Sequence, residues 1–128
     1  MSTRPPLAEL LQQRIVIFDG AMGTELYQRH QFVNICFEQL CLHKPQLVKQ
    51  IHQENAEAGA DVLTTNSFGA NRFKLAGHLL SDRVHELCYE AARIARTVAA
   101  DDCYVAGSVG PLGGQVGFGG ISPEEAFE

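Results

Sequence analysis

The chain has 128 residues, of which 45% are hydrophobic and 20% charged, and its formal net charge is −5. This length and composition are typical of one folded domain and not of a disordered segment. The acidic balance disfavours a nucleic-acid partner, and no apolar run approaches the ~20 residues that span a bilayer, so no membrane partner is expected.

Four cysteines, Cys36, Cys41, Cys88 and Cys103, are too sparse for a disulfide framework in a chain of this length. The N-terminus also lacks the pattern of a secretory signal, so we expect reduced thiols in a cytoplasmic protein. Cys36, Cys41 and His43 lack the tight pairs of most zinc sites. Metal-free thiols are therefore favoured over a metal site.

The N-terminal half is predicted to contain one strand and two helices. Residues 1–13 form a tail that ends in a short helix over residues 7–13, and the apolar run over residues 15–19 predicts a first strand. A long connection follows from residue 20 to residue 44. Pro45 suits the first turn of a helix that Gly59 ends, since proline lacks an N–H and glycine tolerates positive φ. His52, on this helix, is expected at the edge of its apolar face.

The rest of the chain repeats the alternation of strand and helix. Residues 61–65 predict a second strand, and a short helical stretch follows near residues 72–75. Ser81 is expected to cap an amphipathic helix whose apolar residues recur every three or four positions as far as Val98. Residues 103–108 predict a third strand. A glycine-rich loop then leads to a capping box, Ser122-Pro123-Glu124-Glu125, which opens a last helix.

Alternating strands and helices predict an α/β fold with parallel strands and right-handed crossovers. Ligands of such folds bind at the carboxyl ends of the strands. Asp19 ends the first strand, Asn66 follows the second, and Ser108 ends the third. From position alone, Asp19 either binds a ligand or caps a turn. Asn66 either lines the pocket or is a loop residue that bonds its own backbone.

The three strand ends together resemble the homocysteine S-methyltransferase family. The matching segments are residues 19–25, 57–71 and 107–113, within a resemblance that runs from residue 14 to residue 128. The resemblance implies that residues 14–128 form the N-terminal portion, about three β/α units, of a (β/α)8 TIM barrel. The segment over residues 33–40 looks closest to a bacterial branch in which the barrel is fused to a methylenetetrahydrofolate reductase domain.

The resemblance implies a methyltransferase that transfers a methyl group to the thiol of homocysteine and gives methionine. The family uses zinc held by three cysteine thiolates, and none of the four cysteines here matches them. We therefore expect the zinc ligands to lie outside this chain, and the 128-residue fragment to be inactive alone. Folates, corrinoids and sulfonium compounds serve as methyl donors in the family. The fused branch implies methyltetrahydrofolate.

The resemblance also implies roles for the residues at the strand ends. Asp19 would accept hydrogen bonds from the homocysteine ammonium group, and the backbone near Gly20 and around Thr65 to Phe68 would hold the carboxylate. Phe68 would wall the apolar part of the substrate. The complete set of substrate-binding residues implied in this way is Asp19, Gly20, Thr65, Asn66, Ser67, Phe68, Ser108 and Gly110.

Two other readings stay open at this point. One is another β/α-barrel enzyme, such as an aldolase or a phosphate-sugar isomerase, although no lysine lies at any of the three strand ends. The other is a non-catalytic half-barrel that binds a partner or assembles with itself, although the unfinished last helix argues against it. Under any reading, three strands leave open sheet edges, so the chain is expected to self-associate.

Overall fold

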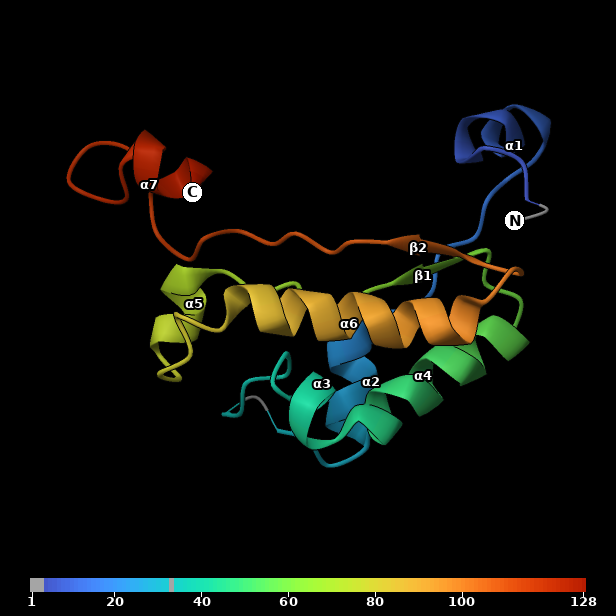
Figure 1. Cartoon of the computed structure of the whole chain (residues 1–128), viewed down its shortest axis with the longest axis horizontal. Coiled ribbons are helices and arrows are strands. Elements are labelled where there is room, and N and C mark those ends of the chain that lie inside the picture. The colour runs from blue at the N-terminus through green and yellow to red at the C-terminus, as the bar shows by residue number, and fades with distance from the viewer. Residues whose placement is uncertain (1–3, 33) are drawn as a thin grey trace.

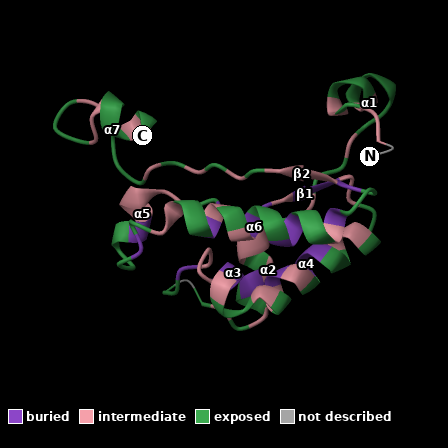
Figure 2. Cartoon of the chain, in the orientation of Figure 1, coloured by how far each residue is buried: buried purple, intermediate pink, exposed green. Residues whose placement is uncertain are grey.

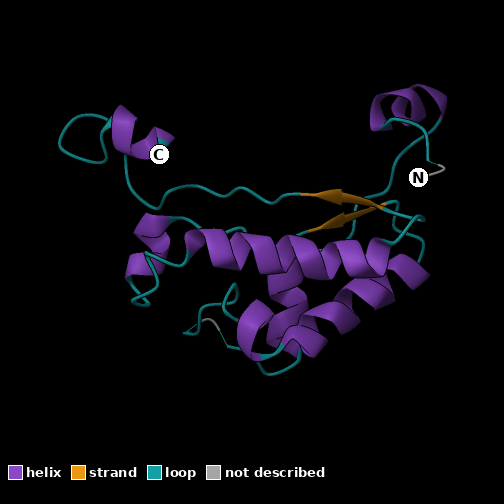
Figure 3. Cartoon of the chain, viewed as in Figure 1, coloured by secondary structure: helices purple, strands orange, loops and turns teal. Residues whose placement is uncertain are grey.

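The computed structural model describes residues 4–32 and 34–128 and contains a small parallel sheet with helices packed on one side of it (Figures 1 and 3). Strand β1 (Val62–Thr64) pairs in parallel with β2 (Tyr104–Ala106), and Leu63 lies opposite Val105. Both strands lie inside the ranges predicted for them. The helices of the described residues are α1 (Leu7–Gln13), α2 (Met22–Gln28), α3 (Leu40–His43), α4 (Pro45–Glu57), α5 (Arg72–Ala76), α6 (Val84–Ala99) and α7 (Pro123–Phe127).

The first predicted strand is reduced to a single parallel bridge between Phe18 and Val62. The segment still follows β1, since Asp61 N donates to Ile17 O at 2.8 Å and Asp19 N donates to Val62 O at 3.0 Å. Its outer edge is open, and the side chain of Ile15 is 85% exposed. Natural proteins often keep the edge strands of a sheet short, and this segment lies at the edge. The strand expected over residues 15–19 is therefore wrong in extent, although its place beside β1 is right.

In Figure 1, helices α2 to α6 lie on one side of β1 and β2, α1 lies on the other side, and α7 lies at the far end of the extended segment that follows β2. Helices α4 and α6 pack against each other and against the strands. Figure 2 shows buried residues along α4 and α6 and mainly exposed residues in α1 and α7. The largest core cluster joins α2, α3, α4 and α6 through Leu26, Leu40, Cys41, Val48, Ile51, Ala91 and Ile94.

Two helices lie in the segment that we predicted as a long connection. Helix α2 contains Gly23 and Thr24, which are poor helix formers, and no side chain caps its N-terminus. Burial explains why it forms, because the side chain of Leu26 is fully buried in the core cluster. Helix α3 has only four residues and buries Leu40 and Cys41. Tertiary packing therefore determines both helices, and the local sequence carries no signal for them.

Proline, glycine and capping residues predicted where the other helices begin and end, and one of these predictions was wrong. Pro45 begins α4, Gly59 follows that helix with φ of +101°, and the capping box of Ser122 and Glu125 is present. Ser81 does not cap α6, because this helix begins at Val84, after Arg83. The predicted tail over residues 1–6 lies partly outside the described residues, as does Val33 in the segment that suggested the fused branch. None of the helices described is long and apolar enough to cross a membrane.

The carboxylate of Asp61, just before β1, holds the segment that precedes Asp19. The guanidinium of Arg14 donates to Asp61 Oδ2 at 2.8 Å and to Oδ1 at 2.6 Å, and Ile17 N donates to Oδ2 at 2.9 Å. These bonds favour the ionised carboxylate and lower the pKa of Asp61 from 3.8 to about 2. A lowered folded-state pKa stabilises the fold above the unfolded pKa, and that stabilisation is lost as the pH falls towards 2.

We therefore expect Asp61→Asn to lower the free energy of unfolding at pH 6 and to change it much less near pH 2. Urea denaturation followed by circular dichroism over this range would measure the difference. Asp101→Asn, at an exposed position, is the control. A difference between wild type and Asp61→Asn that does not vary with pH would contradict the assignment.

The open edge of the sheet also makes self-association a testable expectation. Ile15 and Val109 are 85% and 92% exposed, and both lie in segments that flank the strands. We expect the mean mass in solution to rise with concentration, and Ile15→Lys to reduce that rise. Light scattering over a concentration series is the measurement. Leu79→Lys, at an equally exposed residue between α5 and α6, is the control that should have less effect.

Candidate functional site

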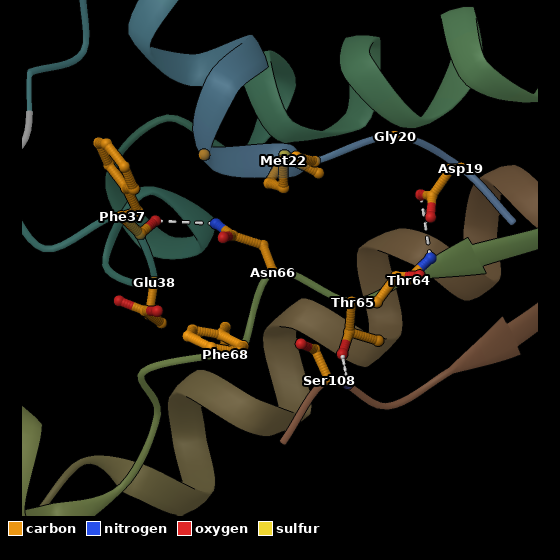
Figure 4. Close-up of a pocket in the computed structure, with 12 residues that line it drawn as sticks. Asp19, Gly20, Met22, Phe37, Glu38, Thr64, Thr65, Asn66, Phe68 and Ser108 are labelled. Atoms are coloured by element: carbon orange, nitrogen blue, oxygen red, sulfur yellow. Dashed lines mark hydrogen bonds between the residues drawn. The ribbon is translucent and has the colours of Figure 1, made fainter. Parts of the chain in front are cut away.

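A cavity of about 360 Å³ opens where the Asp19 segment, β1 and β2 end (Figure 4). This volume falls within the range of about 300–1,000 Å³ that is usual for small-molecule sites. In Figure 4, Asp19 and Thr64 lie at one end, and Phe37, Glu38 and Phe68 lie at the other. The residues that line the cavity are Asp19, Gly20, Ala21, Met22, Gly23, Phe37, Glu38, Thr64, Thr65, Asn66, Phe68 and Ser108.

Asp19 supplies a buried carboxylate at the polar end of the cavity. Its side chain is 2% exposed, and its Oδ2 accepts a hydrogen bond from Thr64 N at 3.0 Å. Its Oδ1 has no hydrogen-bond partner among the described residues. Because buried polar atoms are nearly always paired, the unpaired oxygen is suited to a donor on a ligand. A cationic group would satisfy it best.

His52 lies beside Asp19, and its place differs from the prediction. The imidazole is fully buried instead of lying at the edge of a helix face, and its Nδ1 is 3.9 Å from Asp19 Oδ2. Burial lowers the pKa of His52, while the charge of Asp19 opposes that change. The imidazole is therefore neutral at pH 7 and leaves the charge of Asp19 uncompensated. Helical spacing had placed His52 next to the buried Ile51, but it could not show a partner 33 residues earlier in the chain.

A closed set of hydrogen bonds joins the ends of β1 and β2. Ser108 N donates to Thr65 Oγ1 at 2.9 Å, and Ser67 Oγ donates to Ser108 O at 2.8 Å. The two hydroxyls are 2.7 Å apart. Since the single hydrogen of the Ser67 hydroxyl is used, Thr65 must donate to Ser67. Both hydroxyl hydrogens are thus engaged within the protein, and these side chains hold the strand ends together.

Asn66 positions the wall of the cavity through its side chain. Its Nδ2 donates to Phe37 O at 2.8 Å and lies 3.5 Å from Cys41 Sγ, which joins the end of β1 to the residues around α3. The backbone N–H groups of Gly20, Asn66 and Phe68 donate no hydrogen bond within the part of the chain that the structure describes. Such amides are suited to bind a carboxylate.

Glu38 is a second carboxylate in the cavity wall, and sequence reasoning did not select it. Its Oε1 accepts from Gly69 N at 2.6 Å, and Cys36 Sγ donates to its Oε2 at 3.4 Å. Glu38 therefore holds the loop that carries Phe68. The ring of Phe68 is 56% exposed and has the ammonium of Lys74 5.3 Å from its centre. With Phe37, it gives the cavity an aromatic end.

The structure brings six of the eight predicted residues to this cavity: Asp19, Gly20, Thr65, Asn66, Phe68 and Ser108. Ser67 and Gly110 line a smaller neighbouring cavity instead. Gly110 packs so closely against the Phe68 loop that a Cβ atom there would lie 2.2 Å from Phe68 O. This close approach of two backbones explains why residue 110 is a glycine.

The cysteines of this chain do not fit a site with three zinc-bound thiolates. No group of three or more histidine, cysteine or acidic side chains in the described chain is arranged to hold a metal ion. Cys41 is almost fully buried, and burial raises the pKa of its thiol to about 12. A zinc ligand must be a thiolate, which this environment disfavours. Burial raises the pKa of Cys36, Cys88 and Cys103 as well.

Comparison of the sequence with known protein families shows to which family the chain belongs. The family described as homocysteine S-methyltransferase matches residues 16–128, which include every residue of the cavity. The chain belongs to the homocysteine S-methyltransferase family. The resemblance of the three strand ends is thereby confirmed, and membership disfavours the reading as an unrelated aldolase or isomerase barrel.

Individual relatives agree with this assignment. The chain is 36% identical over 117 residues to methionine synthases of Mycobacterium tuberculosis and Mycobacterium leprae. These alignments cover 82% of the chain but only about a tenth of the length of either relative. The metallated form of the homocysteine methyltransferase MmuM from Escherichia coli is similar in structure, with a TM-score of 0.71 and 28% identity. That match covers 85% of this chain and 42% of MmuM.

Proposed function

We propose that this chain supplies the amino-acid-binding part of a homocysteine S-methyltransferase, whose parent protein transfers a methyl group to the homocysteine thiol and gives methionine. The single observation that carries the proposal is the buried Asp19 carboxylate with one unpaired oxygen at the end of the cavity. A buried carboxylate at this edge is the right partner for the ammonium group of an amino acid. Family membership supports homocysteine as that amino acid.

The cavity offers a complementary group for each part of homocysteine. Asp19 binds the ammonium group, and the unpaired amides of Gly20, Asn66 and Phe68 bind the carboxylate. The aromatic end then covers the methylene groups and leaves the thiol towards the open side of the cavity. Thr65 and Ser67 act by holding the two strand ends in register, because their hydroxyl hydrogens are already used.

The zinc ion belongs to the parent protein in this proposal. Bound zinc stabilises the homocysteine thiolate at neutral pH, and the cysteines that hold it come from outside these 128 residues. The isolated chain would therefore bind the amino acid without methylating it. We propose methyltetrahydrofolate as the methyl donor of the parent, and a cytoplasmic location. The folate is inferred from the resemblance of residues 33–40 to the branch that is fused to a methylenetetrahydrofolate reductase domain.

Two measurements test this proposal. Nuclear magnetic resonance of the labelled chain should show shifts around Asp19 and Asn66 on addition of homocysteine, and smaller shifts with homoserine, which lacks the thiol. A hybrid in which residues 16–128 replace the matching part of MmuM should methylate homocysteine. The same hybrid with Asp19→Asn is the matched control. A folded chain and a folded hybrid that do not bind homocysteine would overturn the proposal.

A further inference from the structure

The site contains a buried histidine whose ring nitrogens are both unpaired. His52 is fully buried, and neither Nδ1 nor Nε2 has a hydrogen-bond partner among the residues that the structure describes. A neutral imidazole has one N–H donor and one acceptor, and leaving both unpaired in the interior costs free energy. Buried polar groups are nearly always paired, so an unpaired imidazole next to a binding site calls for an explanation.

The nearest candidate for that partner is the carboxylate of Asp19. Nδ1 of His52 is 3.9 Å from Asp19 Oδ2, about 0.7 Å beyond the upper limit of an ordinary hydrogen bond. The same Oδ2 already accepts from Thr64 N at 3.0 Å and has a second lone pair for another donor. Oδ1 stays unpaired. His52 does not line the cavity, so it reaches the ligand only through Asp19.

We propose that His52 is a positioning residue for Asp19, and that its Nδ1–H donates to Asp19 Oδ2 when a ligand ammonium group binds Oδ1. This inference rests on the proposed function, because it takes an amino acid as the ligand. With Thr64 N and His52 both on Oδ2, the carboxylate is held in one orientation, and Oδ1 is directed to the ammonium group. Preorganisation of this kind reduces the entropy lost on binding.

The environment of His52 also explains why a histidine is useful at this position. A lysine or arginine next to Asp19 would form an ion pair with it and would compete with the ammonium group of the ligand. A neutral imidazole donates a hydrogen bond without cancelling the negative charge. Burial keeps His52 in that neutral form at pH 7. The site therefore retains a single buried carboxylate charge at this end for the ligand.

The test compares two ligands that differ only at the ammonium group. The 128-residue chain is titrated with homocysteine and with 4-sulfanylbutanoate, which lacks the amino group, and the ratio of the two dissociation constants gives the preference for the ammonium. His52→Phe keeps an aromatic ring but removes the donor. We expect it to lower this preference by about fivefold to tenfold, the usual effect of losing one hydrogen bond. Binding of 4-sulfanylbutanoate should stay unchanged.

Three further variants separate positioning from a general loss of packing. His52→Asn places an amide donor near the position of Nδ1 and should restore the preference, while His52→Gln places it near Nε2 and should not. Val48→Ala removes buried atoms from the same helix, one turn earlier, and should lower stability without changing the preference. If His52→Phe does not fold, the comparison of the Asn and Gln variants decides.

The two proposals fail in different ways. The positioning role would be overturned if His52→Phe kept the wild-type preference for the ammonium group, or if His52→Asn and His52→Gln had equal preferences. Either result would leave the proposed function intact. A folded wild-type chain that binds neither ligand would overturn the proposed function and the positioning role with it. A loss of preference in Val48→Ala equal to that in His52→Phe would show that packing alone is responsible.

Discussion

Asp19→Asn is expected to raise the dissociation constant for homocysteine by about a hundredfold, since truncating one partner of a buried charge pair costs on the order of 2–5 kcal/mol. The amide keeps an oxygen that accepts from Thr64 N, so the strand ends stay in place. What is lost is the negative charge that faces the ammonium group of the ligand. Isothermal titration of the chain or of the hybrid enzyme measures the change.

Two controls define what this result would mean. Asp101→Asn makes the same chemical change at an exposed position and should leave the affinity unaltered. In the complete methyltransferase, Asp19→Asn should weaken homocysteine binding far more than zinc binding, because the cavity here holds no cluster of metal ligands among its described residues. Unchanged affinity for homocysteine would remove Asp19 from the site.

Gly110→Ala is expected to have the second largest effect, through the shape of the site. A Cβ atom at this residue would lie 2.2 Å from Phe68 O and 3.0 Å from two ring carbons of Phe68. Backbone must move to relieve that contact, which costs about 1–3 kcal/mol in a packed region. Because Phe68 lines the cavity, the substitution should also displace the aromatic wall and weaken ligand binding.

The neighbouring glycine provides a matched control for this prediction. Gly107 precedes Ser108, and a Cβ atom there would have no neighbour within 4 Å. Gly107→Ala should therefore change the free energy of unfolding by less than about 0.5 kcal/mol. Urea denaturation gives the stability of both variants, and the methyl and aromatic resonances around Phe68 report its position. Equal behaviour of the two variants would mean that the close approach at Gly110 is unimportant.

The elements with strong local signals were those that the sequence predicted well. Pro45 and Gly59 correctly marked the two ends of α4. The periodic apolar residues correctly located α6, although the predicted cap at Ser81 put its beginning too early. Both strand ends that carry Thr65 and Ser108 were found from apolar runs that turn polar. The resemblance then selected Asp19 and five other residues that the structure places around one cavity.

The residues that were missed depend on contacts between distant parts of the chain. Glu38 reaches the cavity because it accepts from Gly69 N, 31 residues later. His52 meets Asp19 only after α4 has folded onto the sheet. Helix α2 forms because Leu26 is buried by other helices, not because its sequence favours a helix. No periodicity, cap or motif encodes such contacts, so reading the sequence in short windows could not find them.

The hydrogen-bonded ring of Thr65, Ser67 and Ser108 has a consequence for which ligands this edge of the sheet accepts. Since the N–H and C=O of Ser108 fix the direction of the ring, the hydroxyl of Thr65, which lines the cavity, has no hydrogen left to donate to a ligand. Together with the carboxylates of Asp19 and Glu38, this hydroxyl makes the side chains of the cavity wall rich in hydrogen-bond acceptors. A ligand group that reaches Thr65 can therefore bind there only as a donor, and a phosphate would gain no hydrogen bond from this hydroxyl.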